Sequence, residues 1–445
     1  MALGGGPLSS CEVRLWSSTI GAVTWSEGAA SFAYTPEFRR SGIQVAPLHM
    51  PLGEQIFRFP DLARTSFHGL PGLVADSLPD KFGNAVIDAW LARQGRARGE
   101  MNPVERLSYT GQRGMGALEY WPAADTGAGQ NETVEVAELV RLSNAVLHER
   151  EGFQAKLDKH ERDAALVSLL SVGASAGGAR AKAVVAWNRA TGEMRSGQTD
   201  APGDFEHWLI KFDGVNGNSD KELADPMGFG LLEFAYSLMA KAAGITMAEC
   251  LVLEESGRHH FMTKRFDRSV GKHPVSGKLR SEKLHVTTLG GMAHLDYNQA
   301  GAHSYEQAFD VLRKLRMPME DREQLFRRMV FNVLARNQDD HVKNIGFSMD
   351  KSGTWRLAPA YDLTFAYNPR GDWTAKHQMS LNGKRDDFSL VDIGAVGAYA
   401  DLARNRGAKI YDEVAMGVGR WLDFAQEAGL PSDWADQVDK QLRRF

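Results

Sequence analysis

Hydrophobic and polar residues alternate in short runs near the start of the chain. The runs VRLW, GAVTW and ASFAY lie within residues 11–36 and are separated by Ser-Ser and Glu-Gly. Alternation over a few residues, broken by turn-forming residues, is typical of short β-strands. The pattern therefore predicts a small β-meander in this region.

The spacing of apolar residues then becomes helical. Residues 83–94 repeat apolar side chains three and four positions apart, which is typical of one face of a helix. The stretch 121–133, WPAADTGAGQNET, is rich in small and turn-forming residues and is interpreted as a linker. We therefore place a first, β-rich subdomain at residues 1–122.

Two strand-like runs, AVVAW and HWLIKF, follow this linker. Asp225 and Pro226 then predict the start of a helix, because Asp is a good N-cap and Pro fits the first helical position. The expected helix has an apolar stripe from Leu231 to Ala242. We place a second subdomain at residues 123–268.

The remainder of the chain is predicted to be mainly helical. Residues 322–336 carry one apolar stripe, a hairpin is expected at about 345–361, and the last sixty residues have helical spacing again. We place a third subdomain at residues 269–445. Together these elements predict an α+β protein, with two or three subdomains that each bury a core of their own.

Composition narrows the class of protein. The 445 residues are 43% hydrophobic and 24% charged, which is ordinary for a soluble globular protein, and the net charge of −4 excludes a strongly basic nucleic-acid-coating protein. The only cysteines, Cys11 and Cys250, exclude a disulfide framework and a cysteine-based zinc site. No secretion signal or membrane-length apolar stretch is visible, so we expect a cytoplasmic protein without membrane contact.

A polar sequence, NQDDHVKN, separates the helix of 322–336 from the hairpin. It cannot continue the apolar stripe, so it should form a loop. A hairpin turn near Lys351 would bring Asn344 and Asp362 together at the open end, with Asp339 on the adjoining loop.

Phosphoryl transfer needs such a set of groups. One carboxylate takes the proton of the acceptor hydroxyl, while a second carboxylate and an amide oxygen hold Mg²⁺. Asp339 precedes Asn344 by five positions, the spacing of the catalytic Asp and Mg-binding Asn in protein kinases. We assign Asp339 as the base and Asn344 and Asp362 as Mg²⁺ ligands. The alternative is a polar loop whose Asp and Asn side chains cap turns.

Three residues next to these are expected to have supporting roles. Asp340 is the weaker candidate for the base, because the five-residue spacing fits Asp339. His341 is expected to support the loop, because no second histidine stands at metal-ligand spacing. Lys343 is placed to contact phosphate or acceptor.

The stretch 171–187, SVGASAGGARAKAVVAW, combines a glycine-rich turn with a strand-like run. Glycines let backbone N–H groups approach phosphate oxygens, so Gly177, Gly178 and Ala179 are candidates for nucleotide binding. The sequence matches neither the P-loop pattern nor a clean G-x-G-x-x-G, and an ordinary surface hairpin is the alternative.

Lys211 is a charge inside the apolar run HWLIKF. One interpretation is an edge-strand lysine that discourages aggregation. The other is the lysine that binds the α- and β-phosphates of ATP, with Glu233 on the following helix as its ion-pair partner. Glu233 could instead be a solvated residue on a helix flank.

Several motifs resemble those of HipA-type serine/threonine kinases and occur in the same order along the chain. These kinases are the toxin halves of bacterial HipBA toxin–antitoxin modules. The early sequences S-L-P-D-K-F and G-Q-R-G-M-G-A-L are similar to the N-terminal subdomain of that family. The main motifs are S-A-G-G-A-R-A-K (175–182), H-W-L-I-K-F (207–212), K-R-F-D-R (264–268), D-D-H-V-K-N (339–344) and A-P-A-Y-D (358–362).

The resemblance implies a protein-kinase-like, two-lobed fold that uses ATP and Mg²⁺. It implies that Lys264 and Phe266 offer backbone contacts to adenine and that Asp267 lies at the ribose. It also implies that Ser175 is an autophosphorylation site, whose modification ejects the glycine-rich loop and switches the kinase off.

One departure concerns this loop, since Arg180-Ala181 stands where the family commonly has Gln-Glu or Gln-Pro. The resemblance further implies growth arrest through phosphorylation of a cytoplasmic protein, such as an aminoacyl-tRNA synthetase. Its implied partner is a HipB-like helix-turn-helix antitoxin, which alone would contact DNA. Two other functions stay open: an antitoxin-associated co-repressor with little catalysis, and a kinase with a small-molecule or lipid acceptor.

Overall fold

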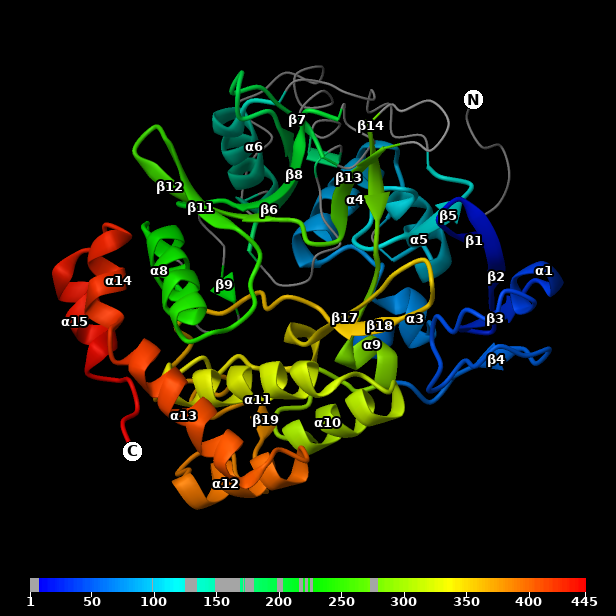
Figure 1. Ribbon diagram of the computed structural model, residues 1–445. Coiled ribbons are helices and arrows are strands. Elements are labelled where there is room, and N and C mark those ends of the chain that lie inside the picture. Colours follow the sequence, from blue (N-terminus) through cyan, green and yellow to red (C-terminus); the bar gives the residue numbers. More distant parts are fainter. Residues whose placement is uncertain are drawn as a thin grey trace.

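The computed structural model describes most of the chain, and Figure 1 shows its elements. The described residues are 8–97, 99–124, 134–148, 169–170, 172, 180–197, 203–215, 219–220, 223–224, 227–272 and 279–445.

The N-terminal region is built on an antiparallel sheet with the strand order β4-β3-β2-β1-β5. Its strands are β1 (Ser10–Leu15), β2 (Ser18–Ser26), β3 (Ala29–Tyr34), β4 (Phe57–Arg58) and β5 (Leu118–Trp121). The first three confirm the predicted meander. Strand β5 returns to pair with β1, with Trp121 opposite Glu12, so the sheet joins the two ends of this region.

Helices connect β3 to β5. They are α1 (Pro36–Arg39), α2 (Arg64–Phe67), α3 (Gly72–Ala75), α4 (Lys81–Arg93) and α5 (Pro103–Thr110). Helix α4 confirms the helix predicted over 83–94. It starts after Asp80, whose carboxylate accepts a hydrogen bond from the N–H of Gly83 at 2.7 Å and so caps the helix.

A second sheet has the strand order β11-β12-β8-β6-β7. Its strands are β6 (Lys182–Trp187), β7 (Met194–Ser196), β8 (Glu206–Lys211), β11 (Cys250–Glu255) and β12 (Arg258–Lys264). Strand β8 pairs with β12 on one side and β6 on the other. Lys211 therefore lies in a central strand, and the edge-strand interpretation of this lysine is wrong.

Helix α8 (Phe229–Ala242) packs against β11 and β12. It begins after Gly228, whose φ of 94° is a left-handed conformation that suits glycine. The predicted start at Asp225 and Pro226 was therefore too early, and those two residues lie outside the described part of the chain. The predicted apolar stripe is confirmed, with Leu231, Leu232 and Ala235 buried.

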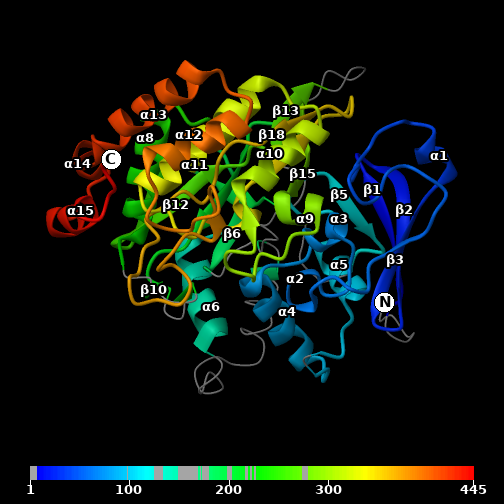
Figure 2. The same ribbon diagram turned by 90° about the horizontal axis from the view of Figure 1, so that it is seen from below.

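The C-terminal part is mainly helical, as predicted. Its helices are α9 (Leu289–Ala293), α10 (Tyr305–Lys314), α11 (Met319–Leu334), α12 (Leu390–Tyr399), α13 (Arg404–Val418), α14 (Trp421–Glu427) and α15 (Ser432–Asp439). Helix α11 confirms the stripe of 322–336 and packs against α10, α12 and α13 (Figures 1 and 2).

Short ladders complete the fold. They are β9 (Ser219–Asp220) with β10 (Leu223–Ala224), β13 (Arg268–Lys272) with β14 (Leu279–Lys283), β16 (His303–Ser304) with β19 (Met379–Ser380), and the sheet of β15 (His285–Thr288), β17 (Gly346–Met349) and β18 (Trp355–Leu357). A further helix, α6 (Val136–His148), lies beside α4. No helix among the described residues is long and apolar enough to cross a membrane.

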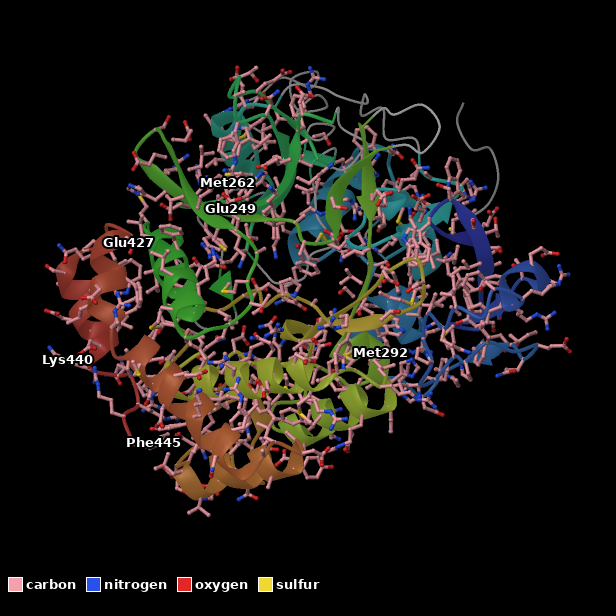
Figure 3. The ribbon with its side chains drawn as sticks, viewed as in Figure 1. Glu249, Met262, Met292, Glu427, Lys440 and Phe445 are labelled. Atoms are coloured by element: carbon pink, nitrogen blue, oxygen red, sulfur yellow. The ribbon has the colours of Figure 1, made fainter. Side chains whose placement is uncertain are left out.

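The cores cross the predicted subdomain boundaries. One core runs from the N-terminal sheet through α8 and the C-terminal helices. A second core joins α4 and α6 to the second sheet, where Met262 of β12 is fully buried (Figure 3). The expectation that each subdomain buries its own core is therefore wrong, because α4 completes a core with strands far along the chain.

Candidate active site

Asp339 lies on a loop that leaves the end of α11. Arg336, with a φ of 55°, turns the chain there, and a short 3-10 helix (Val342–Asn344) follows. The Asp339 carboxylate accepts a hydrogen bond from the indole Nε1 of Trp373 at 2.6 Å. Its side chain remains 22% exposed. Asp339 is thus both oriented and accessible, as a general base must be.

Asn344 is anchored through one side of its amide. Its Nδ2 donates to the backbone oxygen of Asp339 at 2.9 Å, and its backbone N–H donates to the oxygen of His341 at 2.9 Å. The five-residue spacing noted in the sequence therefore closes a compact loop. Its amide oxygen has no hydrogen-bond partner among the described residues, so it is available to a cation.

The predicted hairpin is confirmed by β17 and β18, which pair Phe347 with Leu357. At its open end the hydroxyl of Tyr361 donates to the backbone oxygen of Lys343 at 2.8 Å. Gly346 makes this approach possible, because a Cβ there would lie 2.9 Å from that hydroxyl. The contact brings the segment of Asp362 beside the loop that carries Asp339 and Asn344.

Asp362 itself has a φ of 52°, a left-handed conformation that is uncommon for a residue other than glycine. One carboxylate oxygen accepts a hydrogen bond from Nζ of Lys211. Burial would raise its pKa, but Lys211 and Lys182 outweigh burial and lower the pKa to about 2. Asp362 is therefore held as an anion.

Lys211 joins three distant segments. Its Nζ contacts Oε1 of Glu233 at 2.5 Å and Oδ1 of Asp362, and the lysine is almost fully buried. Burial would lower its pKa, but the two carboxylates outweigh burial and raise it. The lysine stays charged, and the expected contact with Glu233 is present.

Glu233 has a second cationic partner. Its other oxygen accepts a hydrogen bond from Nη1 of Arg180 at 3.0 Å, and that guanidinium lies over the Phe229 ring at 4.7 Å. Glu233 is only 1% exposed, so the interpretation as a solvated flank residue is wrong. In the sequence, Arg180 stood out only because it differs from the residue that is common in HipA-type kinases. The sequence did not indicate its contact with Glu233.

The first subdomain also reaches this region. Lys182 stands directly opposite Lys211 in the β6–β8 ladder, and its Nζ lies 3.5 Å from Oδ2 of Asp80. Both side chains are almost fully buried. Asp80 thus caps α4 with one oxygen and faces Lys182 with the other. The S-L-P-D-K-F motif therefore contacts the strand that pairs with the strand of Lys211.

The two residues expected to offer backbone contacts to adenine, Lys264 and Phe266, differ in whether their N–H groups are already used. The backbone N–H of Lys264 already donates to Glu249 at 2.8 Å, so it is used within the sheet. The backbone N–H of Phe266 has no hydrogen-bond partner among the described residues, and its ring stacks on Tyr361 with centroids 6.2 Å apart. Phe266 therefore keeps a backbone donor for a ligand.

Asp267 does not fit the ribose contact. It is fully buried and accepts hydrogen bonds from Arg265 at 2.7 and 2.9 Å, Arg268 at 2.6 Å and the N–H of Gly116 at 2.7 Å. Burial would raise its pKa, but the two arginines hold it below its usual range. Asp267 joins the N-terminal G-Q-R-G-M-G-A-L motif to the segment after β12, and both its oxygens are occupied there.

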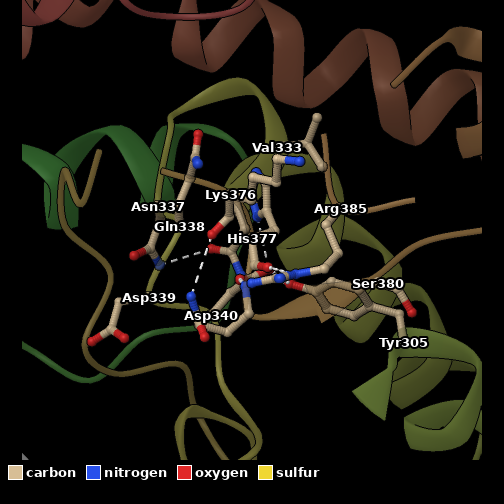
Figure 4. A network of polar contacts seen from close by, with 12 residues as sticks. Tyr305, Val333, Asn337, Gln338, Asp339, Asp340, Lys376, His377, Ser380 and Arg385 are labelled. Carbon is tan, nitrogen blue, oxygen red and sulfur yellow. Dashed lines mark hydrogen bonds and ion pairs between the residues drawn. The ribbon is translucent and has the colours of Figure 1, made fainter. Parts of the chain in front are cut away.

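Asp340 points into the protein, away from Asp339 (Figure 4). Its carboxylate accepts hydrogen bonds from the Tyr305 hydroxyl at 2.7 Å, His377 Nδ1 at 2.9 Å and the N–H of Gln378 at 2.8 Å. Burial would raise its pKa, but these contacts outweigh burial and lower it. Asp340 thus anchors the loop.

Two of its neighbours lie near the aromatic ring of Tyr297. His341 packs against this ring with centroids 5.8 Å apart, and Nζ of Lys343 lies 4.5 Å from the ring centroid. His341 therefore supports the loop, as expected.

The available ligand atoms fit Mg²⁺ only in part. Among the described residues, no group of three or more His, Cys, Asp or Glu side chains could hold a metal ion by itself. The amide oxygen of Asn344 and the second carboxylate oxygen of Asp362 are hard oxygen donors without hydrogen-bond partners in the described part of the chain. Mg²⁺ commonly takes one or two such protein ligands and completes its shell with phosphate and water.

Ser175, Gly177, Gly178 and Ala179 lie outside the described residues. The sequence does not indicate a role for Trp373 and His377, because they stand in WTAKHQ, a stretch without periodicity or motif. Their contacts with Asp339 and Asp340 depend on how the 373–378 segment folds back over the loop.

Comparison with known proteins places these features in a family context. Residues 174–442 match the model described as HipA-like C-terminal domain, and residues 11–121 match the HipA N-terminal domain. A putative kinase of Sinorhizobium fredii, Y4mE, is 28% identical over 204 residues, which cover 44% of this chain and 47% of that protein. A putative kinase of Haemophilus influenzae is 29% identical over 104 residues, covering 23% and 30%. The alignments thus span less than half the length of either relative.

A solved structure shares the whole fold. The HipA chain in the complex of HipA, HipB and operator DNA from Shewanella oneidensis superposes with a TM-score of 0.65 at 17% identity, over 97% of this chain and 95% of that chain. This likeness confirms the expected fold class, a β-rich N-terminal region followed by a kinase-like body with a helical C-terminal part.

Proposed function

Because this chain belongs to the HipA family, as the models matching 11–121 and 174–442 show, we propose that it is an ATP-dependent serine/threonine protein kinase of the toxin type. The observation that carries the proposal is the buried lysine Lys211, held between Glu233 and Asp362 from two other segments. A charged lysine fixed by a helix carboxylate beside an anionic Asp is the arrangement that kinases use to bind ATP phosphates.

The residues then divide the work as follows. Lys211 exchanges its contact with Asp362 for the phosphates, while Glu233 keeps it in place. Asp339, oriented by Trp373, takes the proton of the acceptor hydroxyl. Mg²⁺ held by Asn344 and Asp362 would neutralise charge on the transferred phosphate. Phe266 offers its backbone to adenine, and Lys343 stands on the acceptor side of the loop.

We further propose an acceptor and a partner. The acceptor is a cytoplasmic protein of the translation apparatus, such as an aminoacyl-tRNA synthetase, and phosphorylation of Ser175 switches the kinase off. The glycine-rich loop with Gly177, Gly178 and Ala179 covers the phosphates. The partner is a HipB-like helix-turn-helix protein, by analogy with the Shewanella complex, and contact with DNA is made only through it.

Phosphosite mapping after incubation with Mg-ATP tests the enzyme. We expect phosphate on Ser175 in the intact protein, and a loss of at least about 10²-fold in rate for Asp339→Asn, which removes the base. Asp423→Asn is the matched control, because Asp423 has a side chain that is 67% exposed on α14. Equal phosphorylation of all three proteins, or no ATP binding by any of them, would refute the proposal.

Growth on expression separates the toxin from a co-repressor. Arrest that requires Asp339 and is relieved by the neighbouring helix-turn-helix protein supports the kinase toxin. Operator repression that is unchanged in Asp339→Asn, without any growth effect in the intact protein, favours the co-repressor instead.

A further inference from the structure

A chain of buried contacts links the segment after α15 to the catalytic loop. Nη1 of Arg443 lies 2.9 Å from Nε2 of His377, and Nδ1 of His377 lies 2.9 Å from Oδ2 of Asp340. The His377 side chain is fully buried, Asp340 is 1% exposed, and Arg443 is 9% exposed. We call the contacts from Arg443 through His377 to Asp340 the relay. Asp340 is next to Asp339 in the chain, so the relay ends beside the proposed base.

The chemistry of the three groups fixes the tautomer of His377. A guanidinium can only donate hydrogen bonds, so Nε2 of His377 must be the acceptor and carries no hydrogen. The hydrogen then resides on Nδ1, which donates to the carboxylate of Asp340. An imidazole in one tautomer therefore connects a cation to an anion.

Arg443 is itself held in place. Its backbone N–H donates to Leu334 at 2.9 Å and its Nη1 to Val333 at 3.1 Å, both at the end of α11. Nη2 pairs with Asp386, and the guanidinium lies 5.2 Å from the centre of the Phe388 ring. The relay is thus attached at one end to the helix from which the catalytic loop departs.

The surroundings of His377 contain several charged or titratable groups. Asp340 comes from the loop that carries Asp339, Tyr305 from α10, Arg443 from the segment after α15, and Arg385 and Asp386 from the segment that follows β19. Arg385 donates to the backbone oxygen of His377 at 2.6 Å. Of these groups, only Arg443 and Asp340 contact the ring nitrogens.

Holding Asp340 inward has a direct consequence for Asp339. The two residues share a tight turn in which the N–H of His341 donates to the backbone oxygen of Asp339 at 2.9 Å, and Figure 4 shows Asp339 directed away from the cluster around Asp340. The same 373–378 segment that carries His377 also supplies Trp373, which binds Asp339. A shift of this segment would therefore move both carboxylates.

We propose that Arg443 is a positioning residue for the catalytic loop, acting through the tautomer of His377 and the anchored carboxylate of Asp340. The proposal rests on the proposed kinase function, since it concerns the orientation of Asp339. It assigns a role in the reaction to a residue that follows α15 and touches neither nucleotide nor acceptor.

The test compares Arg443→Met, Arg443→Lys and Arg444→Met in the full chain. Arg444 is the matched control, because it follows Arg443 directly in the chain. Its side chain is 59% exposed and pairs with Asp439. We expect Arg443→Met to lower kcat about tenfold, as for loss of one hydrogen bond to an oriented group, with KM for ATP within about twofold. Arg443→Lys keeps a cationic donor and should recover part of the loss, and Arg444→Met should match the wild type.

The ring nitrogens of His377 give a readout that does not depend on activity. Long-range ¹H–¹⁵N spectra of ¹⁵N-histidine-labelled protein, assigned with His377→Gln, should show hydrogen on Nδ1 and none on Nε2. In Arg443→Met we expect the ¹⁵N signal of Nε2 to shift, because this nitrogen loses the guanidinium donor at 2.9 Å. The double variant Arg443→Met with His377→Gln should be no slower than His377→Gln alone, because both act on one chain of contacts.

The outcomes separate the two proposals. An unchanged Nε2 signal in Arg443→Met, equal losses in the Arg443 and Arg444 variants, or additive losses in the double variant would each overturn the relay. A wild-type protein without kinase activity would sink the proposed function, whereas the spectra of wild type and Arg443→Met would still decide whether Arg443 binds Nε2 of His377.

Discussion

Replacement of Asp267 by Asn tests whether this residue joins two parts of the protein or binds nucleotide. In the structure its carboxylate accepts four hydrogen bonds, three from Arg265 and Arg268 and one from the N–H of Gly116. The two arginine side chains are 1% and 5% exposed. Asn at this position would leave two buried guanidinium groups without their anion.

The expected cost follows from this burial. Removing one partner of a buried ion pair costs about 3–5 kcal/mol, whereas an exposed pair is worth about 0–1 kcal/mol. We expect Asp267→Asn to lower the free energy of unfolding by about 3–5 kcal/mol, measured by chemical denaturation. Asp423→Asn, which breaks an exposed pair with Arg420, should cost less than about 1 kcal/mol.

The pH dependence provides a second measurement. The pKa of Asp267 is depressed in the folded protein, so its contribution to stability is fully present above the unfolded pKa of about 3.9 and is lost as pH falls towards the folded value. The difference between the wild type and Asp267→Asn should therefore be constant above about pH 5 and shrink below about pH 4.

One result would refute the reasoning. A variant of unchanged stability that binds ATP more weakly would mean that Asp267 contacts the ribose after all. A loss of less than about 1 kcal/mol with normal ATP binding would also refute it, because the two arginines would then not depend on this carboxylate.

Three further substitutions test the site. Trp373→Phe removes the indole donor to Asp339 and should lower kcat about tenfold in steady-state assays, with KM for ATP unchanged. Gly346→Ala places a Cβ 2.9 Å from the hydroxyl of Tyr361 and should cost about 1–3 kcal/mol in chemical denaturation; an unchanged midpoint would contradict the tight packing. Glu233→Gln removes a carboxylate from the buried lysine and should lower kcat/KM for ATP at least about tenfold in ATP titrations of the rate, whereas normal kinetics would exclude its anchoring role.

The amino-acid sequence alone was sufficient for those features that are set by neighbours along the chain. Alternation and helical spacing depend on which face of a single element is buried, so the meander of 11–36, helix α4 and helix α11 were predicted correctly. Turn residues fixed the hairpin of β17 and β18, and with it the approach of the Asp362 segment to the catalytic loop.

The tertiary structure decided what depends on partners far apart in the sequence. Lys211 and Asp362 are 151 positions apart, and only the strand order places the lysine in a central strand between two buried carboxylates. Asp267 was expected at a ligand but pairs with two buried arginines, and Arg443 meets His377 only because the segment after α15 returns to α11. Periodicity along the sequence does not predict such contacts. The strength of a buried ion pair depends on the burial and geometry that the whole fold creates.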